Sequence, residues 1–231
     1  MGKIYNGILT ALLVIVIVAI IGLLGFWMYE MYTKSALERD AMSAIKEFEE
    51  AIKQSNTIQT ENVIETIITN EVIEDVIKPE VNTVETPTTN NNTTTSKPTT
   101  FKGYKLAGYI EIPKTKVNLP VLEVVTGPSL EVAVGVLHGP GLNKVGNTII
   151  VGHNYRNSRF FSNNDKIAIG DKIYITDMSG KKVTYVVYNQ YLTTPEDADY
   201  MIRETNGVRE ISLSTCTDDS SKRIITWARE Q

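Results

Sequence analysis

A run of 21 residues near the N-terminus, from Ile8 to Met28, is apolar apart from Thr10 and a few glycines. As a helix rising about 1.5 Å per residue it would span about 31 Å, close to the roughly 30 Å hydrocarbon core of a bilayer. The apolar core of a cleaved signal peptide, the alternative, is usually about 7–15 residues long and precedes small residues. This run instead ends in aromatic residues, which are typical of a membrane interface. The pattern predicts an uncleaved membrane anchor over residues 1–33.

The charges beside this anchor only weakly indicate its orientation. Lys3 lies on one side, and Lys34 and Arg39 lie just past the other. The rest of the chain has the character of an extracytoplasmic protein. We therefore expect a single-pass protein of the cell membrane, with its N-terminus inside and its folded domain extracellular.

Two amphipathic stretches and a low-complexity segment follow the anchor. Residues 35–54 and 60–78 carry apolar side chains at helical spacing, and the second stretch stops at Pro79. They predict a helical stalk over residues 34–79, although they could also pack on each other or dimerise. Residues 83–100 contain nine threonines, a composition that cannot bury a core. This segment predicts a disordered linker over residues 80–103.

Residues 104–231 have the length of one folded domain with a single core. Short alternating or apolar runs recur between turn signals, at 108–113, 117–122, 147–152, 171–177, 182–188, 210–215 and 223–228. Helical patterns are brief and fall near 129–134, 158–162 and 196–203. The pattern predicts a mainly β domain, a mostly antiparallel barrel or closed sandwich with short helices in its loops. The net charge is −4 and no basic stripe is present, so nothing indicates nucleic-acid binding.

Cys216 is the only cysteine of the chain, and it ends the strand-like run 211–216. A lone cysteine cannot form an intrachain disulfide, even in an oxidising exterior. Three interpretations remain: a buried small residue, an intermolecular bridge and a nucleophile. The nucleophile requires partners that activate the thiol.

Two residues are placed to act with Cys216. His153 directly follows an apolar run and so leaves the end of a core strand, whereas His138 lies in a turn-like segment and is expected to be a surface residue. Arg223 follows the cysteine by seven residues, and both can reach one face if neighbouring strands carry them. An imidazolium and a guanidinium stabilise a thiolate, and histidine can protonate a leaving amine. Arginine can stabilise an oxyanion, so the three would suffice for acyl transfer through a thioester.

These residues resemble the active site of the sortases, the cysteine transpeptidases of the Gram-positive cell surface. Thr215-Cys216 followed by Arg223 resembles the family's cysteine and arginine motif, and residues 146–154 resemble its histidine segment. Further similar segments are 108–113, 118–121 and 160–174. The resemblance runs from about Tyr104 to Ala228.

The resemblance implies an eight-stranded sortase-type β barrel in which His153, Cys216 and Arg223 are catalytic. It also implies that Thr215, Leu213 and Asn154 contact the substrate and that the segment 192–202 selects it. The expected substrate is an LPxTG-like C-terminal sorting signal of a surface protein. The expected acceptor is an amine of a cell-wall precursor or of a pilin.

The resemblance leaves the class open, as housekeeping-like or class B-like. No cofactor is expected, although some relatives bind calcium through acidic loop residues, for which Glu123, Asp165 and Asp171 are the candidates here.

Other interpretations of the function stay open. An L,D-transpeptidase would have glycine where Thr215 stands, and a papain-like hydrolase would place its cysteine at a helix start. A surface adhesin on a stalk, with an incidental cysteine, is the alternative that is not an enzyme.

Overall fold

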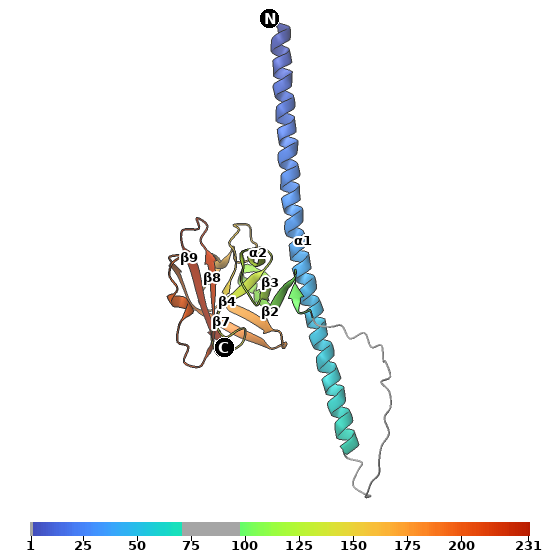
Figure 1. Cartoon of the computed structure of the whole chain (residues 1–231), viewed down its shortest axis with the longest axis vertical. Coiled ribbons are helices and arrows are strands. Elements are labelled where there is room, and N and C mark those ends of the chain that lie inside the picture. The colour runs from blue at the N-terminus through green and yellow to red at the C-terminus, as the bar shows by residue number, and fades with distance from the viewer. Residues whose placement is uncertain (1, 71–97) are drawn as a thin grey trace. The chain divides into compact units, whose positions relative to one another are not determined.

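The structure is a computed structural model that describes residues 2–70 and 98–231 (Figure 1). The predicted linker up to residue 97, and the part of the predicted stalk beyond residue 70, lie outside the described residues. The helical N-terminal part and the β domain are described separately below.

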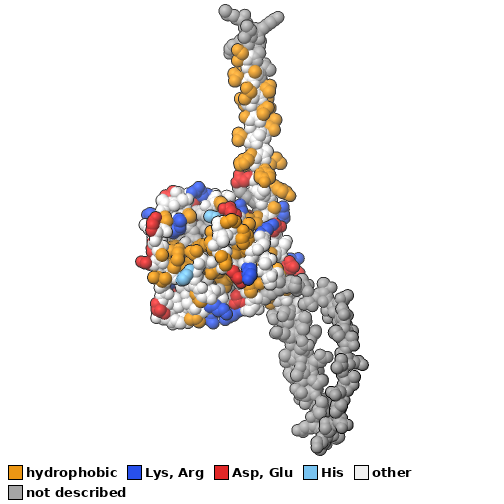
Figure 2. All heavy atoms as spheres, in the orientation of Figure 1, with side chains coloured by type: hydrophobic (Ala, Val, Ile, Leu, Met, Phe, Trp, Pro, Cys, Tyr) orange, Lys and Arg blue, Asp and Glu red, His pale blue; other side chains and the backbone are white. Residues whose placement is uncertain are grey.

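The N-terminal part is one helix, α1 (Gly2–Asn70). An 18-residue window within it has a mean hydropathy of 2.9, so by length and composition this helix could cross a membrane. Its apolar side chains are exposed along this stretch, as Figure 2 shows in orange. Two separate helices were expected beyond the anchor, but α1 continues unbroken through residues 55–59. That segment contains neither proline nor glycine, so nothing interrupts the helical hydrogen bonds.

The β domain is one sheet that closes on itself (Figure 1). Around the barrel the order is β2-β3-β4-β5-β8-β9-β7-β6, and β6 pairs again with β2. The pairs β3–β4 and β5–β8 are parallel, and the others are antiparallel. The strands are β1 (Thr100–Phe101), β2 (Tyr104–Ile112), β3 (Val117–Leu122), β4 (Val134–His138), β5 (Gly146–Val151), β6 (Lys172–Asp177), β7 (Lys182–Thr193), β8 (Arg209–Cys216) and β9 (Arg223–Glu230). Because β1 is only a short addition beside β2, this fold confirms the predicted eight-stranded barrel.

Short helices lie in the loops, as expected, though not always at the predicted places. They are η1 (Pro113–Thr115), α2 (Gly127–Leu130), η2 (Asn164–Lys166) and η3 (Asp199–Met201). The pattern near 129–134 was taken as helical throughout, but α2 ends at Leu130 and β4 begins at Val134. His138 is therefore the last residue of a strand and does not lie in a turn. No helix forms at 158–162, where the backbone of Ser158 and Phe160 has positive φ.

The barrel core is centred on β5, β8 and β9. Six consecutive residues of β8 are buried, from Glu210 to Thr215, because both faces of this strand are covered. On one side of the sheet, Tyr200 of η3 packs with Ile149 and Ile225 in a buried apolar cluster. The segment between β7 and β8, residues 194–208, thus covers the central strands. Residues at the C-terminal ends of β5 and β8 are held on a rigid, well-packed base.

The turn that follows β4 passes very close to β5 at Gly139. Its φ is +107°, and a Cβ there would lie 2.2 Å from the carbonyl oxygen of Asn147. Gly141 has a similar φ of +104°, but the nearest atom to its Cβ would be 4.0 Å away. Both alanine substitutions should cost about 1–2 kcal/mol for the left-handed backbone. Gly139→Ala should lower the free energy of unfolding further, by about 1–3 kcal/mol, because β5 must shift. Equal losses in denaturant unfolding of the two variants would contradict this close approach.

Candidate active site

The ends of two parallel strands set His153 and Cys216 at the same level of the sheet. β5 and β8 pair in register, and the pairing continues just beyond β5. The N–H of Gly152 donates to the carbonyl of Ser214 (3.3 Å), and the hydroxyl of Thr215 donates to the carbonyl of Gly152 (2.8 Å). His153 therefore stands one step further along, level with Cys216 at the end of β8. Side chains at the same level of parallel strands leave the sheet on the same face.

Arg223 reaches the same sulfur from the other side. Cys216 and Arg223 are directly paired across the antiparallel strands β8 and β9. The Nη1 atom of Arg223 lies 3.1 Å from the Sγ atom of Cys216, which is a half-buried free thiol. A guanidinium at this distance stabilises negative charge on the sulfur. The three predicted catalytic side chains thus come from three adjacent strand ends.

A tight turn closes the short segment between Cys216 and Arg223. The N–H of Thr217 donates to the carbonyl of Lys222 (3.0 Å). The carboxylate of Asp219 accepts from the Thr217 hydroxyl (2.5 Å), and from the hydroxyl (2.7 Å) and backbone N–H (3.0 Å) of Ser221. These hydrogen bonds, that from Thr217 first, lower the pKa of Asp219 to about 2. The turn therefore keeps its carboxylate ionised and holds its shape at any ordinary pH.

Asn154 ties the segment after His153 to this turn. Its amide nitrogen donates to the carbonyl of Cys216 (2.9 Å) and to the carboxylate of Asp218 (2.9 Å). Its amide oxygen accepts from the N–H of Arg156 (2.9 Å). The side chain predicted to contact substrate is thus engaged in fixing the histidine segment beside the cysteine.

The other two predicted substrate-binding residues lie inside the barrel wall. Leu213 is fully buried in the core, and Thr215 is 3% exposed, with its hydroxyl bonded to the neighbouring strand. Both side chains therefore support β8 in this structure, and their contact with a substrate stays a prediction.

Two side chains beside His153, those of Glu131 and Tyr155, were not found from the sequence. The Nε2 atom of His153 lies 3.5 Å from Oε1 of Glu131, and the Tyr155 hydroxyl donates to Oε2 of the same carboxylate. The rings of His153 and Tyr155 are 5.1 Å apart between centroids. Glu131 follows α2, far from the histidine segment in sequence, and no motif links the two. Only the closed barrel places them together.

The acidic residues considered for calcium do not gather into a site. Among residues 2–70 and 98–231, no three His, Cys, Asp or Glu side chains whose placement is described lie close enough together to hold a metal ion. The carboxylate of Asp171 accepts from the N–H of Ala168 (2.8 Å) and so closes a local turn. Calcium binding remains an untested expectation.

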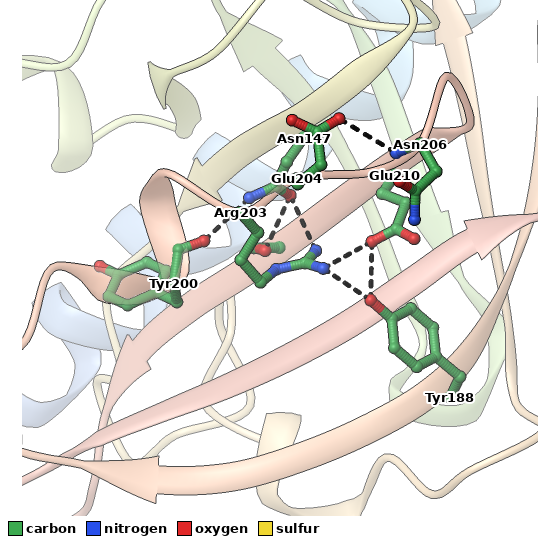
Figure 3. Close-up of polar contacts among 8 residues, drawn as sticks. Asn147, Tyr188, Tyr200, Arg203, Glu204, Asn206 and Glu210 are labelled. Atoms are coloured by element: carbon green, nitrogen blue, oxygen red, sulfur yellow. Dashed lines mark hydrogen bonds and ion pairs between the residues drawn. The ribbon is translucent and has the colours of Figure 1, made fainter.

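A buried polar network anchors the segment 194–208 to the sheet (Figure 3). The Nη1 atom of Arg203 lies 2.7 Å from the Glu210 carboxylate, and their side chains are only 14% and 8% exposed. The Tyr188 hydroxyl donates to the same carboxylate (2.6 Å) and accepts from Arg203 (2.8 Å). The guanidinium of Arg203 also lies 4.1 Å from the ring centroid of Trp227. Burial, and then the bond to Glu210, raises the pKa of Tyr188 to about 12, so it remains a donor at neutral pH.

Asn147 of β5 extends this network to the segment's own backbone. Its amide nitrogen donates to the carbonyl of Tyr200 (2.9 Å). Its amide oxygen accepts from Arg203 (3.3 Å) and from the hydroxyl of Ser212 (2.9 Å). The contacts labelled in Figure 3 therefore bind the segment 194–208 to β5, β7 and β8 at once. This segment includes most of the stretch predicted to select the substrate.

Comparison with known proteins identifies the fold and its family. The family model of the sortase domain matches residues 110–231, more than half of the chain. The chain belongs to the sortase family. The search of curated proteins gave no match for this sortase.

Solved sortases of several classes resemble this one. Sortase A from Corynebacterium diphtheriae aligns with a TM-score of 0.51 and 27% identity, over 55% of this chain and 61% of its own. A Clostridium perfringens sortase D5 transpeptidase aligns with a TM-score of 0.50 and 28% identity, over 55% of this chain and 79% of its own. Sortase C1 from Streptococcus suis aligns with a TM-score of 0.51 and 27% identity, over 55% of this chain and 74% of its own. This sortase thus spans less than two thirds of the Corynebacterium enzyme, and these likenesses do not single out one class.

The buried pair of Arg203 and Glu210 gives a prediction for stability. Arg203→Met leaves a buried carboxylate without its cation and should cost about 3–5 kcal/mol of unfolding free energy. Lys182→Met breaks a pair of similar length with Glu111 (3.0 Å), but these side chains are 53% and 44% exposed. That control should cost less than about 1 kcal/mol. Denaturant unfolding followed by tryptophan fluorescence measures both, and a loss at Arg203 as small as that at Lys182 would contradict the anchoring role.

Proposed function

We propose that this sortase is a cysteine transpeptidase that cleaves an LPxTG-like C-terminal sorting signal and transfers the acyl part to an amine. One observation carries the proposal. The Arg223 guanidinium lies 3.1 Å from the only thiol of the chain, and the register of β5 and β8 sets His153 level with that thiol. In this proposal Cys216 is the nucleophile, His153 the proton donor and Arg223 the fixed positive charge.

The proposed reaction begins with attack by the Cys216 thiolate on the carbonyl carbon of a Thr–Gly type bond, which forms a C–S bond. The tetrahedral intermediate then collapses, the C–N bond breaks, and the leaving amine takes the proton of the His153 imidazolium. Arg223 carries a positive charge at every pH of interest and stabilises the oxyanion of the intermediate.

In the second half of the proposed reaction, an acceptor amine attacks the thioester carbonyl. A new C–N bond forms, the Cys216 thiolate leaves, and the amine's proton passes to His153. The starting thiolate and imidazolium are thereby restored. The proposed acceptors are an amine of a cell-wall precursor and a lysine amine of a pilin.

The proposed location is the outer face of the cell membrane. Support comes from α1, which contains an apolar stretch long enough to cross a bilayer, and from membership of a family of cell-surface enzymes. With the N-terminus inside, the barrel would meet both membrane-bound substrates and growing cell wall.

The test is cleavage of a labelled LPxTG-like peptide in the presence of a glycine-based amine acceptor. Cys216→Ala and His153→Ala should each lose at least about 10³-fold in kcat/KM, because the nucleophile or the proton donor is gone. His138→Ala is the matched control and should keep nearly full activity, because this exposed residue lies at the end of β4. If the wild-type chain binds the peptide but never cleaves it, and Cys216→Ala binds equally well, the chain is a binding module.

Arg223→Lys separates the role of the guanidinium from that of its charge. Lysine keeps the charge but cannot reproduce the planar, multiply donating group, so kcat/KM should fall by about 10²-fold. Steady-state kinetics with the same peptide gives the value. Turnover close to that of the wild type would remove Arg223 from the mechanism.

A further inference from the structure

We propose that Glu131 is a positioning residue for this reaction, whose carboxylate orients the His153 imidazole and favours its protonated form. The inference rests on the proposed function, in which His153 supplies the proton to the leaving amine. It concerns a residue outside the three catalytic side chains and outside the strands that carry them.

The backbone of Glu131 is fixed by the short helix before it. Thr126 and Ser129 form reciprocal side-chain to backbone hydrogen bonds at the start of α2. The N–H of Glu131 then donates to the carbonyl of Pro128 (3.3 Å) at the end of this helix. The side chain therefore starts from a defined position when it reaches to 3.5 Å from Nε2 of His153.

Tyr155 holds the carboxylate from its other oxygen. Its hydroxyl donates to Oε2 of Glu131, so the two carboxylate oxygens have separate partners, a phenol and an imidazole. The Tyr155 ring is itself fixed between the imidazole, the Phe160 ring at 5.7 Å and the Arg159 guanidinium at 5.1 Å. Burial and the contact with Glu131 raise the pKa of Tyr155, so its hydroxyl keeps its proton at neutral pH. This arrangement is the pattern in which a second group fixes the orientation of a catalytic histidine.

The charges around His153 make a carboxylate useful at this position. Two cations contact neighbours of His153: the Arg223 guanidinium of β9 lies 3.1 Å from the Cys216 sulfur, and the Arg159 guanidinium lies 5.1 Å from the Tyr155 ring centroid. A cation close to an imidazole disfavours its charged form. The Cys216 thiolate on β8 favours it, and Asp218 on the following turn is bonded to Asn154. Among the described residues, Glu131 is the one whose carboxylate is within ion-pair distance of His153. A carboxylate at this distance attracts an imidazolium, which is the charge state that the proposed reaction requires.

In the proposed arrangement Nε2 of His153 faces Glu131, and Nδ1 exchanges a proton with the leaving and attacking amines. Both partners are partly exposed, His153 by 37% and Glu131 by 62%, so the electrostatic effect is modest and sensitive to salt.

The decisive variant is Glu131→Gln, which keeps the shape and removes the charge. In full-length protein labelled with [¹³Cε1]-histidine, the His153 titration midpoint should move to lower pH, because the attraction of a negative charge to the imidazolium is lost. His138 is the only other histidine and serves as an internal control that should not move. Glu111→Gln, which removes an equal charge from an exposed pair on β2, should leave both midpoints unchanged. In 1 M NaCl the difference between wild type and Glu131→Gln should largely disappear.

Peptide kinetics completes the test. The acid limb of the plot of kcat/KM against pH should also move to lower pH in Glu131→Gln. In Tyr155→Phe it should move the same way by a smaller amount, because the Glu131 carboxylate loses the hydroxyl that holds it in position. An unmoved His153 midpoint in a folded Glu131→Gln variant overturns the inference, as does a lower rate at every pH without a shift of the limb. If the midpoint moves but no peptide is transferred by any form, the proposed function is wrong and the Glu131–His153 coupling stands.

Discussion

The parallel pairing of β5 with β8 is the contact on which the candidate site depends. The two strands lie about sixty residues apart in sequence, and six consecutive residue pairs fix their register. A slip of one residue would turn His153 away from the face that Cys216 occupies, because side chains alternate along a strand. The adjacent antiparallel pair then sets Arg223 directly opposite Cys216. The backbone hydrogen bonds of these two strand pairs thus fix the relative positions of His153, Cys216 and Arg223.

Polar side chains secure this arrangement where the strands end. Asn154 joins the histidine segment to the turn after Cys216, and Asp219 closes that turn. Near the start of β8, the buried pair of Arg203 and Glu210 anchors the segment 194–208. Buried polar groups of this kind cost free energy unless they are paired, so they favour one arrangement of the loops over alternatives. The loops around the site are therefore ordered by the same strands that carry the catalytic candidates.

Much of this could be predicted from the sequence, because strand alternation and a lone cysteine are local signals. The barrel and its family followed from runs such as 147–152 and from Thr215-Cys216 with Arg223. β4 was missed because it is short and continues a helix-like pattern. The continuous α1 was missed because the gap between the apolar patterns of residues 35–54 and 60–78 was taken as the boundary between two helices. Glu131 and the Arg203–Glu210 pair could not be found, since a charged residue shows its partner only after distant segments pack together.

The proposed reaction depends on a covalent acyl intermediate at the sulfur of Cys216. The direct measurement is to mix the chain with an LPxTG-like peptide without acceptor, quench in acid and map the modified peptide by mass spectrometry. We expect an acyl group that ends in the threonine carbonyl, attached at Cys216 and released by hydroxylamine. Cleavage of the peptide with no adduct at Cys216, under conditions where a thioester would persist, would contradict it.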